Sequence, residues 1–145
     1  MKDADQLLEL IREATSPFHA VEAAVKQLKK AGFEERALGE EWELERGHKY
    51  FVVHHDSTLI AFHVGNAVTT DKGQLRIAAA HTDFPCLRIK PIPDMKEERY
   101  ARVNTEVYGG AILNTWLDRP LSVAGRVAIK SENVFQPDMR LVRVD

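Results

Sequence analysis

The chain has 145 residues, enough for one modest domain with its own hydrophobic core. Hydrophobic residues make up 44% and charged residues 29%, as in an ordinary globular protein, and the formal net charge of −2 excludes the basic surplus of a sequence-independent nucleic-acid binder. No apolar run approaches the roughly 18 to 20 residues of a membrane-spanning helix, and the single cysteine excludes an internal disulfide framework. Because the N-terminus is acidic and helical rather than a targeting peptide, we expect a cytoplasmic protein that binds neither nucleic acid nor membranes.

Two helices are predicted at the start of the chain. Apolar residues at helical spacing predict a first helix over residues 4–14, with Asp3 as its N-cap. Ser16 followed by Pro17 is a standard start signal for a second helix, and Gly32 supplies its stop. The buried stripe of the second helix is predicted to be Phe18, Val21, Val25 and Leu28.

The pattern then changes to that of strands. Residues 49–54 and 58–64 predict a β-hairpin with its turn near Asp56 and Ser57. Residues 74–80 (QLRIAAA) predict a third strand, which is apolar enough to be central in a sheet. The middle of the chain is therefore expected to be mainly β.

Further strands are expected toward the end of the chain. Residues 86–92 alternate in hydropathy and predict a strand that ends at the prolines 91 and 93, before a charged loop over residues 96–99. The remaining strands are expected at residues 100–107, 111–116, 121–130 and 140–144. This order of elements predicts mixed α and β structure with a boundary near residues 93–98.

The final residues resemble the middle of a domain rather than its end. Residues 139–145 (MRLVRVD) alternate like a strand and then stop without a turn, a cap or a polar tail. We therefore expect the chain to be the N-terminal part of a longer protein.

A histidine and an aspartate follow the most apolar predicted strand, in the stretch AAAHTDFPCLRIKP. In an extended chain, residues i and i+2 project from the same face, so His81 and Asp83 can approach each other. A metal-bound imidazole commonly donates its second ring N–H to a carboxylate, which fixes its tautomer. Two interpretations stay open on spacing alone: a metal ligand with its orienting carboxylate, or surface residues that make an ordinary hydrogen bond.

Four blocks of sequence together resemble the M18 metalloaminopeptidases, the family of aspartyl aminopeptidase. They are residues 15–33 (TSPFHAVEAAVKQLKKAGF), 49–65 (KYFVVHHDSTLIAFHVG), 81–91 (HTDFPCLRIKP) and 106–127 (EVYGGAILNTWLDRPLSVAGRV). The blocks stand in the family's order and cover most of the chain. The resemblance implies an α/β fold, in which residues 1–95 begin a zinc-exopeptidase-type catalytic domain and residues 96–145 begin an inserted β-rich dimerisation domain.

The resemblance also implies an activity, a cofactor and partners. It implies a cytosolic peptidase that removes N-terminal residues from peptides, often Asp or Glu, with two divalent metal ions, usually zinc. Cobalt or manganese would also suit an imidazole ligand. Family members assemble from dimers into large homo-oligomers, typically dodecamers.

The resemblance assigns roles to three residues of this chain. His81 matches the family's first metal histidine, Asp83 matches the carboxylate that orients it, and Asn114 stands where some members carry a histidine that reaches toward substrate. The family's other ligands and its general-base glutamate would lie outside this chain, so the 145 residues alone are expected to be inactive.

Other candidates have two interpretations each. Asp118 would be a metal ligand or the structural ion-pair partner of Arg119, and residues 108–110 would be a tight turn or bulge needing positive φ or part of a substrate entrance. His19 would be a packing or capping histidine or a catalytic one, and Cys86 a buried small hydrophobe or a nucleophile. The remaining polar candidates, expected to be solvated, are His54, His55 and His63 on the hairpin and the pairs Glu34–Glu35 and Glu40–Glu41 in a charged loop.

Three functions are consistent with these patterns. The first is the N-terminal segment of a dinuclear metallo-exopeptidase. The second is a non-catalytic assembly or dimerisation module, and the third is a metal-dependent deacylase or amidohydrolase that shares the His-x-Asp strand. Residues 106–127 disfavour the third, because that block is peculiar to the M18 layout.

Overall fold

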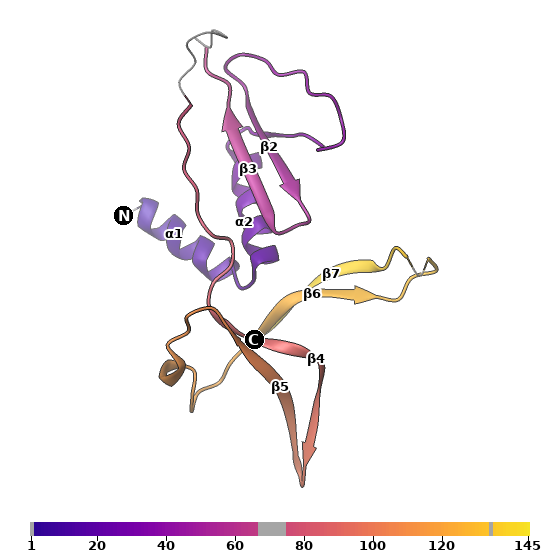
Figure 1. Ribbon diagram of the computed structural model, residues 1–145. Coiled ribbons are helices and arrows are strands. Elements are labelled where there is room, and N and C mark those ends of the chain that lie inside the picture. Colours follow the sequence, from indigo (N-terminus) through magenta and orange to yellow (C-terminus); the bar gives the residue numbers. More distant parts are fainter. Residues whose placement is uncertain (1, 67–74, 134) are drawn as a thin grey trace. The chain divides into compact units, whose positions relative to one another are not determined.

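The computed structural model describes residues 2–66, 75–133 and 135–145, which form two compact units (Figure 1). Unit 1 comprises residues 1–82 and 123–145, and unit 2 comprises residues 83–122. The mixture of helices and β-sheets agrees with the expected α/β class. Within the described ranges, no helix is both long and apolar enough to cross a membrane.

Unit 1 opens with two helices, α1 (Lys2–Glu13) and α2 (Pro17–Lys30). Both were predicted, but Asp3 lies inside the first turn of α1 and does not precede it as the expected N-cap. Its carboxylate there complements the positive end of the helix dipole.

The start and end signals of α2 are confirmed. The Ser16 hydroxyl accepts the backbone N–H of His19 at 3.3 Å, and Pro17 occupies the first helical position. Just beyond the C-cap, Gly32 takes a φ of +79°, the left-handed conformation that ends a helix.

A three-stranded sheet follows in unit 1, in the order β1-β2-β3. Strands β2 (Lys49–His54) and β3 (Thr58–His63) form the predicted antiparallel hairpin, closed by His55 and Asp56 with φ of +51° and +58°. Strand β1 (Glu34–Glu35) pairs parallel to β2, so the expectation of a loop at these two residues was wrong. A strand this short carries no periodicity from which it could be predicted.

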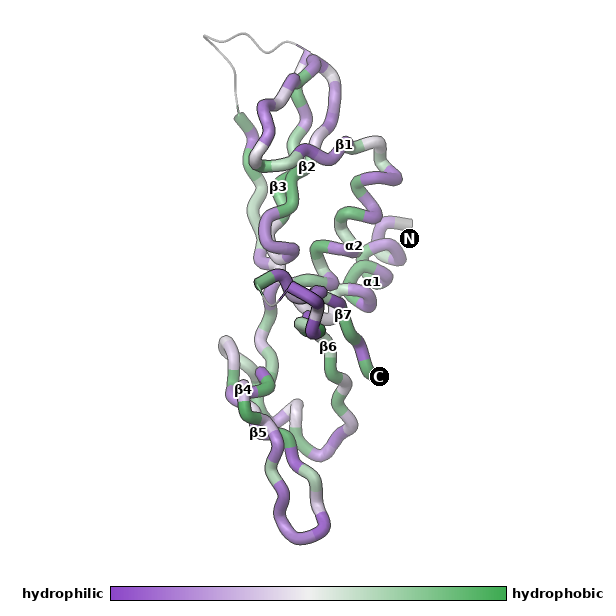
Figure 2. Tube along the Cα trace, turned by 90° about the vertical axis from the view of Figure 1, so that its right-hand side faces the viewer, coloured by the Kyte–Doolittle hydropathy of each residue, from purple (hydrophilic) through white to green (hydrophobic). Residues whose placement is uncertain are grey.

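Strand β2 supplies most of the core of unit 1. Tyr50 and Phe51 are fully buried, and Val52 is nearly so. Phe51 lies near α2, where the Lys29 ammonium is 5.8 Å from its ring centroid, whereas the Tyr50 ring packs 5.7 Å from that of Phe62 on β3. The strand is therefore covered on both of its faces, and Figure 2 shows the hydrophobic colours along it.

The central strand predicted at residues 74–80 was wrong for the part that the structure describes. Residues 75–80 are extended without strand pairing, and Leu75 and Ile77 are 83% and 80% exposed. The segment runs alongside β3 in both Figures 1 and 2. Its hydropathy fits a central strand, but a strand also needs hydrogen-bonded neighbours, and the described residues form no ladder with this segment.

Unit 1 is completed by a second hairpin from the end of the chain. Strands β6 (Val123–Ile129) and β7 (Asp138–Val144) pair antiparallel, close to their predicted positions. Arg126 ties β6 to the rest of the unit: its guanidinium lies 4.3 Å from the ring centroid of Phe18 on α2 and 2.7 Å from the carboxylate of Asp56.

Unit 2 is built on one long hairpin, β4 (Cys86–Glu97) and β5 (Tyr100–Tyr108). The prolines 91 and 93 do not end the strand as predicted, because the register shifts between Ile89 and Asp94 and the bulge accommodates them. A strand with only one paired neighbour tolerates proline on its open edge.

Two further expectations fail in unit 2. The loop predicted at residues 96–99 is confined to the turn at residues 98–99. The strand predicted at residues 111–116 is instead a short 3₁₀ helix, η1 (Leu113–Thr115), whose turn is closed by the Thr115 N–H donating to the Ile112 carbonyl. The domain boundary expected between residues 95 and 96 falls within β4 and stays a prediction about the whole protein.

Candidate functional site

His81 lies at the end of the extended segment of unit 1, and its side chain is exposed. The next residue anchors this end: the Thr82 hydroxyl donates to the backbone carbonyl of Ser57, at the turn between β2 and β3, over 2.8 Å. His81 is therefore an exposed residue at the end of a segment that Thr82 anchors.

Asp83 begins unit 2 and precedes β4 in a stretch without regular structure. Its half-buried carboxylate accepts a hydrogen bond from the hydroxyl of Tyr108, the last residue of β5. The hydrogen bond to Asp83, and then its negative charge, raise the pKa of the Tyr108 hydroxyl. Sequence reasoning missed this partner, because it requires the β4–β5 register, in which Cys86 lies opposite Tyr108.

The Tyr108 ring contacts Arg88, and the next residue begins a turn. The Arg88 guanidinium lies over it, 3.9 Å from the ring centroid. On the C-terminal side, Gly109 takes a φ of +72°, and a Cβ there would lie 3.4 Å from the Cα of Pro85. The turn with positive φ that was predicted at residues 108–110 is thus confirmed.

The remaining predicted site residues of unit 2 follow β5. Asn114 lies exposed on η1, and Asp118 is exposed with a φ of +55°. Cys86, expected to be buried, is a half-buried free thiol. The roles assigned to His81, Asp83 and Asn114 stay predictions.

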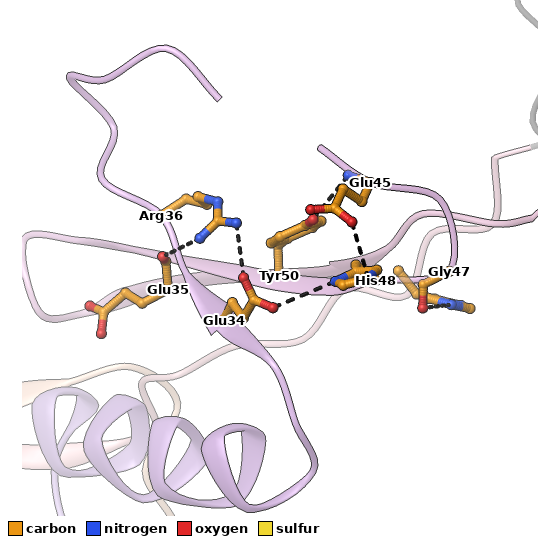
Figure 3. Close-up of polar contacts among 8 residues, drawn as sticks. Glu34, Glu35, Arg36, Glu45, Gly47, His48 and Tyr50 are labelled. Carbon is orange, nitrogen blue, oxygen red and sulfur yellow. Dashed lines mark hydrogen bonds and ion pairs between the residues drawn. The ribbon is translucent and has the colours of Figure 1, made fainter. Parts of the chain in front are cut away.

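Unit 1 contains a polar cluster that the sequence did not reveal (Figure 3). His48 lies between two carboxylates: its Nδ1 is 3.5 Å from Glu34, and its Nε2 is 3.5 Å from Glu45. Arg36 also binds Glu34, at 2.9 Å, and the Tyr50 hydroxyl accepts the backbone N–H of Glu45. The two carboxylates face opposite nitrogens of the imidazole ring, so they and the ring cannot bind the same metal ion. The cluster instead links the loop before β2 to β1.

The other histidines also have structural surroundings. His19 Nδ1 lies 2.7 Å from the hydroxyl of Ser16, which supports the expected capping role. His63 Nε2 lies 3.2 Å from the Gly47 carbonyl. A groove of about 510 Å³ in unit 1 is lined by α2, β1, β2, β6, β7 and Asp56 of the β2–β3 turn, and His81 is not among its lining residues.

The described residues include a suitable type of zinc ligand but too few ligands close together to bind the ion. An imidazole such as that of His81 is a good zinc ligand, and catalytic zinc sites use three protein ligands. Among the described residues, no three His, Cys, Asp or Glu side chains lie close enough to hold a metal ion. The described residues thus do not bring together a complete set of zinc ligands around His81.

Comparison with known proteins gives a consistent result. The family model "Aminopeptidase I zinc metalloprotease (M18)" matches residues 10–145. A curated relative from Clostridium novyi, "Probable M18 family aminopeptidase 2", is 48% identical over 146 residues, which are 100% of this chain and 34% of the relative. The chain therefore spans about a third of the length of that relative.

Solved structures share the fold. The structure of mApe1 from Chaetomium thermophilum superposes with a TM-score of 0.81 at 35% identity, over 97% of this chain and 32% of that one. The mApe1 dodecamer of S. cerevisiae superposes with a TM-score of 0.80 at 24% identity, over 97% of this chain and 33% of that one. At the lower identity, the likeness concerns the fold alone.

Proposed function

Because this chain belongs to the M18 family of aminopeptidase I zinc metalloproteases, we propose that the full-length protein is a zinc-dependent aminopeptidase, a hydrolase that removes N-terminal residues from peptides. The observation that carries the proposal is the match of the family model over residues 10–145. The fragment of catalytic machinery that this chain would supply is the pair His81 and Asp83.

In this proposal His81 is a ligand of the metal centre and Asp83 accepts the N–H of its other ring nitrogen. The spacing i, i+2 in an extended chain supports the pairing, and a carboxylate in this position raises the basicity of the ligand. When bound, two zinc ions would activate a water molecule and polarise the scissile carbonyl. Cobalt and manganese are alternatives that an imidazole also accepts.

The substrate preference is a finer part of the proposal. The resemblance to aspartyl aminopeptidase supports peptides with an N-terminal Asp or Glu. Asn114 is the proposed contact to substrate: its exposed amide on η1 can donate and accept hydrogen bonds but cannot act as a general acid or base.

The assembly is proposed as well. The resemblance to the M18 family supports a homo-oligomer built from dimers, such as a dodecamer. The cytoplasmic location expected from the sequence stays a prediction. Residues 1–145 alone are expected to lack activity, because zinc catalysis needs more ligands than the described residues bring together.

A second candidate is a non-catalytic assembly module, which one observation favours. The hairpin of unit 2 exposes large apolar side chains on both strands, a composition typical of interfaces. They include Ile89, Ile92, Met95, Val103 and Val107.

Zinc content and turnover of the full-length protein separate the two candidates. His81→Ala should lose both bound zinc and hydrolysis of an aspartyl anilide, and excess zinc should not restore them. Asp83→Asn keeps one acceptor oxygen but loses the charge, so we expect a decrease of about 10- to 100-fold that excess zinc partly restores. His54→Ala, which removes an exposed histidine at the end of β2, is the matched control. Wild-type zinc content in His81→Ala would contradict the proposed role of His81 as a metal ligand. The assembly module would then be the remaining candidate function.

A further inference from the structure

We propose that Tyr108 is a positioning residue of the metal centre, which acts by holding the carboxylate of Asp83 in the orientation that His81 requires. The inference rests on the proposed function, since it gives Asp83 the role of orienting a metal-bound imidazole. In this proposal the turn at residues 108–110 contributes to the metal centre through the Tyr108 side chain, which would contact Asp83 and neither the metal nor the substrate.

Asp83 lies just before β4, in a stretch (residues 83–85) that belongs to no helix or strand. Tyr108, 25 residues later, donates its hydroxyl to Oδ2 of Asp83. This contact engages a particular oxygen of the carboxylate, and an oriented carboxylate is what a ligand histidine needs for one tautomer and one ring orientation.

Tyr108 is itself well placed to hold a neighbour. Its backbone is paired with Cys86 at the end of the β4–β5 ladder, and its ring lies under the Arg88 guanidinium. The positive φ of Gly109 lets the chain turn away immediately afterwards and pass close to Pro85. The donor is thus set by strand register, ring packing and a turn, which together bring β5 to the residues just before β4.

A purely structural role would have a different signature. A hydrogen bond that only fastened the start of β4 would stabilise the protein equally with and without zinc. A positioning role instead predicts a change in zinc affinity that disappears when the carboxylate is removed, because two residues that act through one contact are not additive.

The experiment measures the zinc dissociation constant of the full-length protein by competition with a chelator. Tyr108→Phe keeps the ring beneath Arg88 and removes only the hydroxyl. We expect about 3- to 10-fold weaker zinc binding, less than the loss typical of residues that contact the ligand directly, and a zinc-free protein that still folds, with a slightly lower melting temperature from the missing hydrogen bond. Tyr100→Phe is the matched control, because Tyr100 begins the same strand and is 70% exposed.

The second part repeats the measurement in an Asp83→Ala background, where adding Tyr108→Phe should change zinc affinity by less than about twofold. Three results would each overturn the inference. The first is wild-type zinc affinity in Tyr108→Phe, and the second is an equal loss of zinc affinity when Tyr108→Phe is added to Asp83→Ala. The third is a Tyr108→Phe protein that does not fold without zinc. His81→Ala distinguishes the failures: if it loses zinc while Tyr108→Phe does not, the proposed function stands and only the role of Tyr108 falls.

Discussion

Ser16 shows how much one side chain can determine locally. Its hydroxyl accepts the N–H of His19, lies 2.7 Å from the His19 ring and is buried, so the residue combines the N-cap of α2 with part of the packing around it. Such a cap is readable from sequence because donor and acceptor are only three residues apart. By contrast, Tyr108 and Asp83 are 25 residues apart, and only the strand register brings them together.

We expect Ser16→Ala to lower the free energy of unfolding by about 1 kcal/mol, because the first N–H groups of α2 lose their acceptor. The comparison is with Ser122→Ala, the same chemical change at an exposed serine. Thermal melting of the zinc-free full-length protein measures both. Equal melting temperatures for the two variants would show that the cap contributes nothing.

The His81–Asp83 pair marks the limit of residue-level prediction. The pattern identifies the two residue types and their common face. It does not identify what holds Asp83, because the contact from Tyr108 depends on the pairing of β4 with β5. Such a partner is visible only once the strands are aligned.

At the scale of elements, prediction succeeded where the signal was local. Both helices and the β2–β3 hairpin have their caps, turns and periodicity within a few residues of each other. The strand predicted at residues 74–80, described from residue 75 onward, and the strand predicted at residues 111–116 failed for a different reason. The hydropathy pattern predicts which face of a strand is buried. Whether the strand forms depends on hydrogen bonds to a neighbouring strand, which the pattern does not identify.

The turn after β5 provides a test at this scale. Gly109→Ala places a Cβ at a φ of +72° and 3.4 Å from Pro85, so we expect a loss of about 1–2 kcal/mol in the free energy of unfolding. Gly110→Ala is the matched control, because a Cβ at that position meets no atom within 4 Å. Chemical denaturation of the zinc-free full-length protein gives both values. If Gly109→Ala cost no more than Gly110→Ala, the strain assigned to this turn would be disproved.

At the scale of the whole molecule, the main feature is exposed apolar surface. Leu75 and Ile77 are mostly exposed in an extended segment, and unpaired extended chain with apolar side chains promotes association. In relatives about three times as long, further chain is present that could cover such a segment. The α/β class could be predicted from the order of elements. Which part of the protein would pack against this segment could not.

We therefore expect a polypeptide of residues 1–145 to associate in solution. Light scattering should show oligomers whose population rises with concentration, and the double change Leu75→Lys with Ile77→Lys should reduce it, because charges on an edge oppose pairing. Leu113→Lys, at an exposed leucine on η1, is the control for added charge alone. A sharp monomeric peak at high concentration would refute this expectation.

The chain order of the two units also has a consequence for how the protein forms during synthesis. Unit 2 is contiguous, and its two strands are joined by the turn at residues 98–99, so its contacts are close in sequence and quick to form. Unit 1 is interrupted, and some of its contacts span most of the chain: Arg143 donates to the carbonyl of Arg12, 131 residues away. A ribosome releases the partners of α2 on β6 only after the whole of unit 2 has emerged. The core residues of unit 1, from Val21 to Val52, leave the ribosome before unit 2 does, so β6 and β7 are expected to join a core that has already packed. A folded unit 2 shortens the loop that must close for them to reach it.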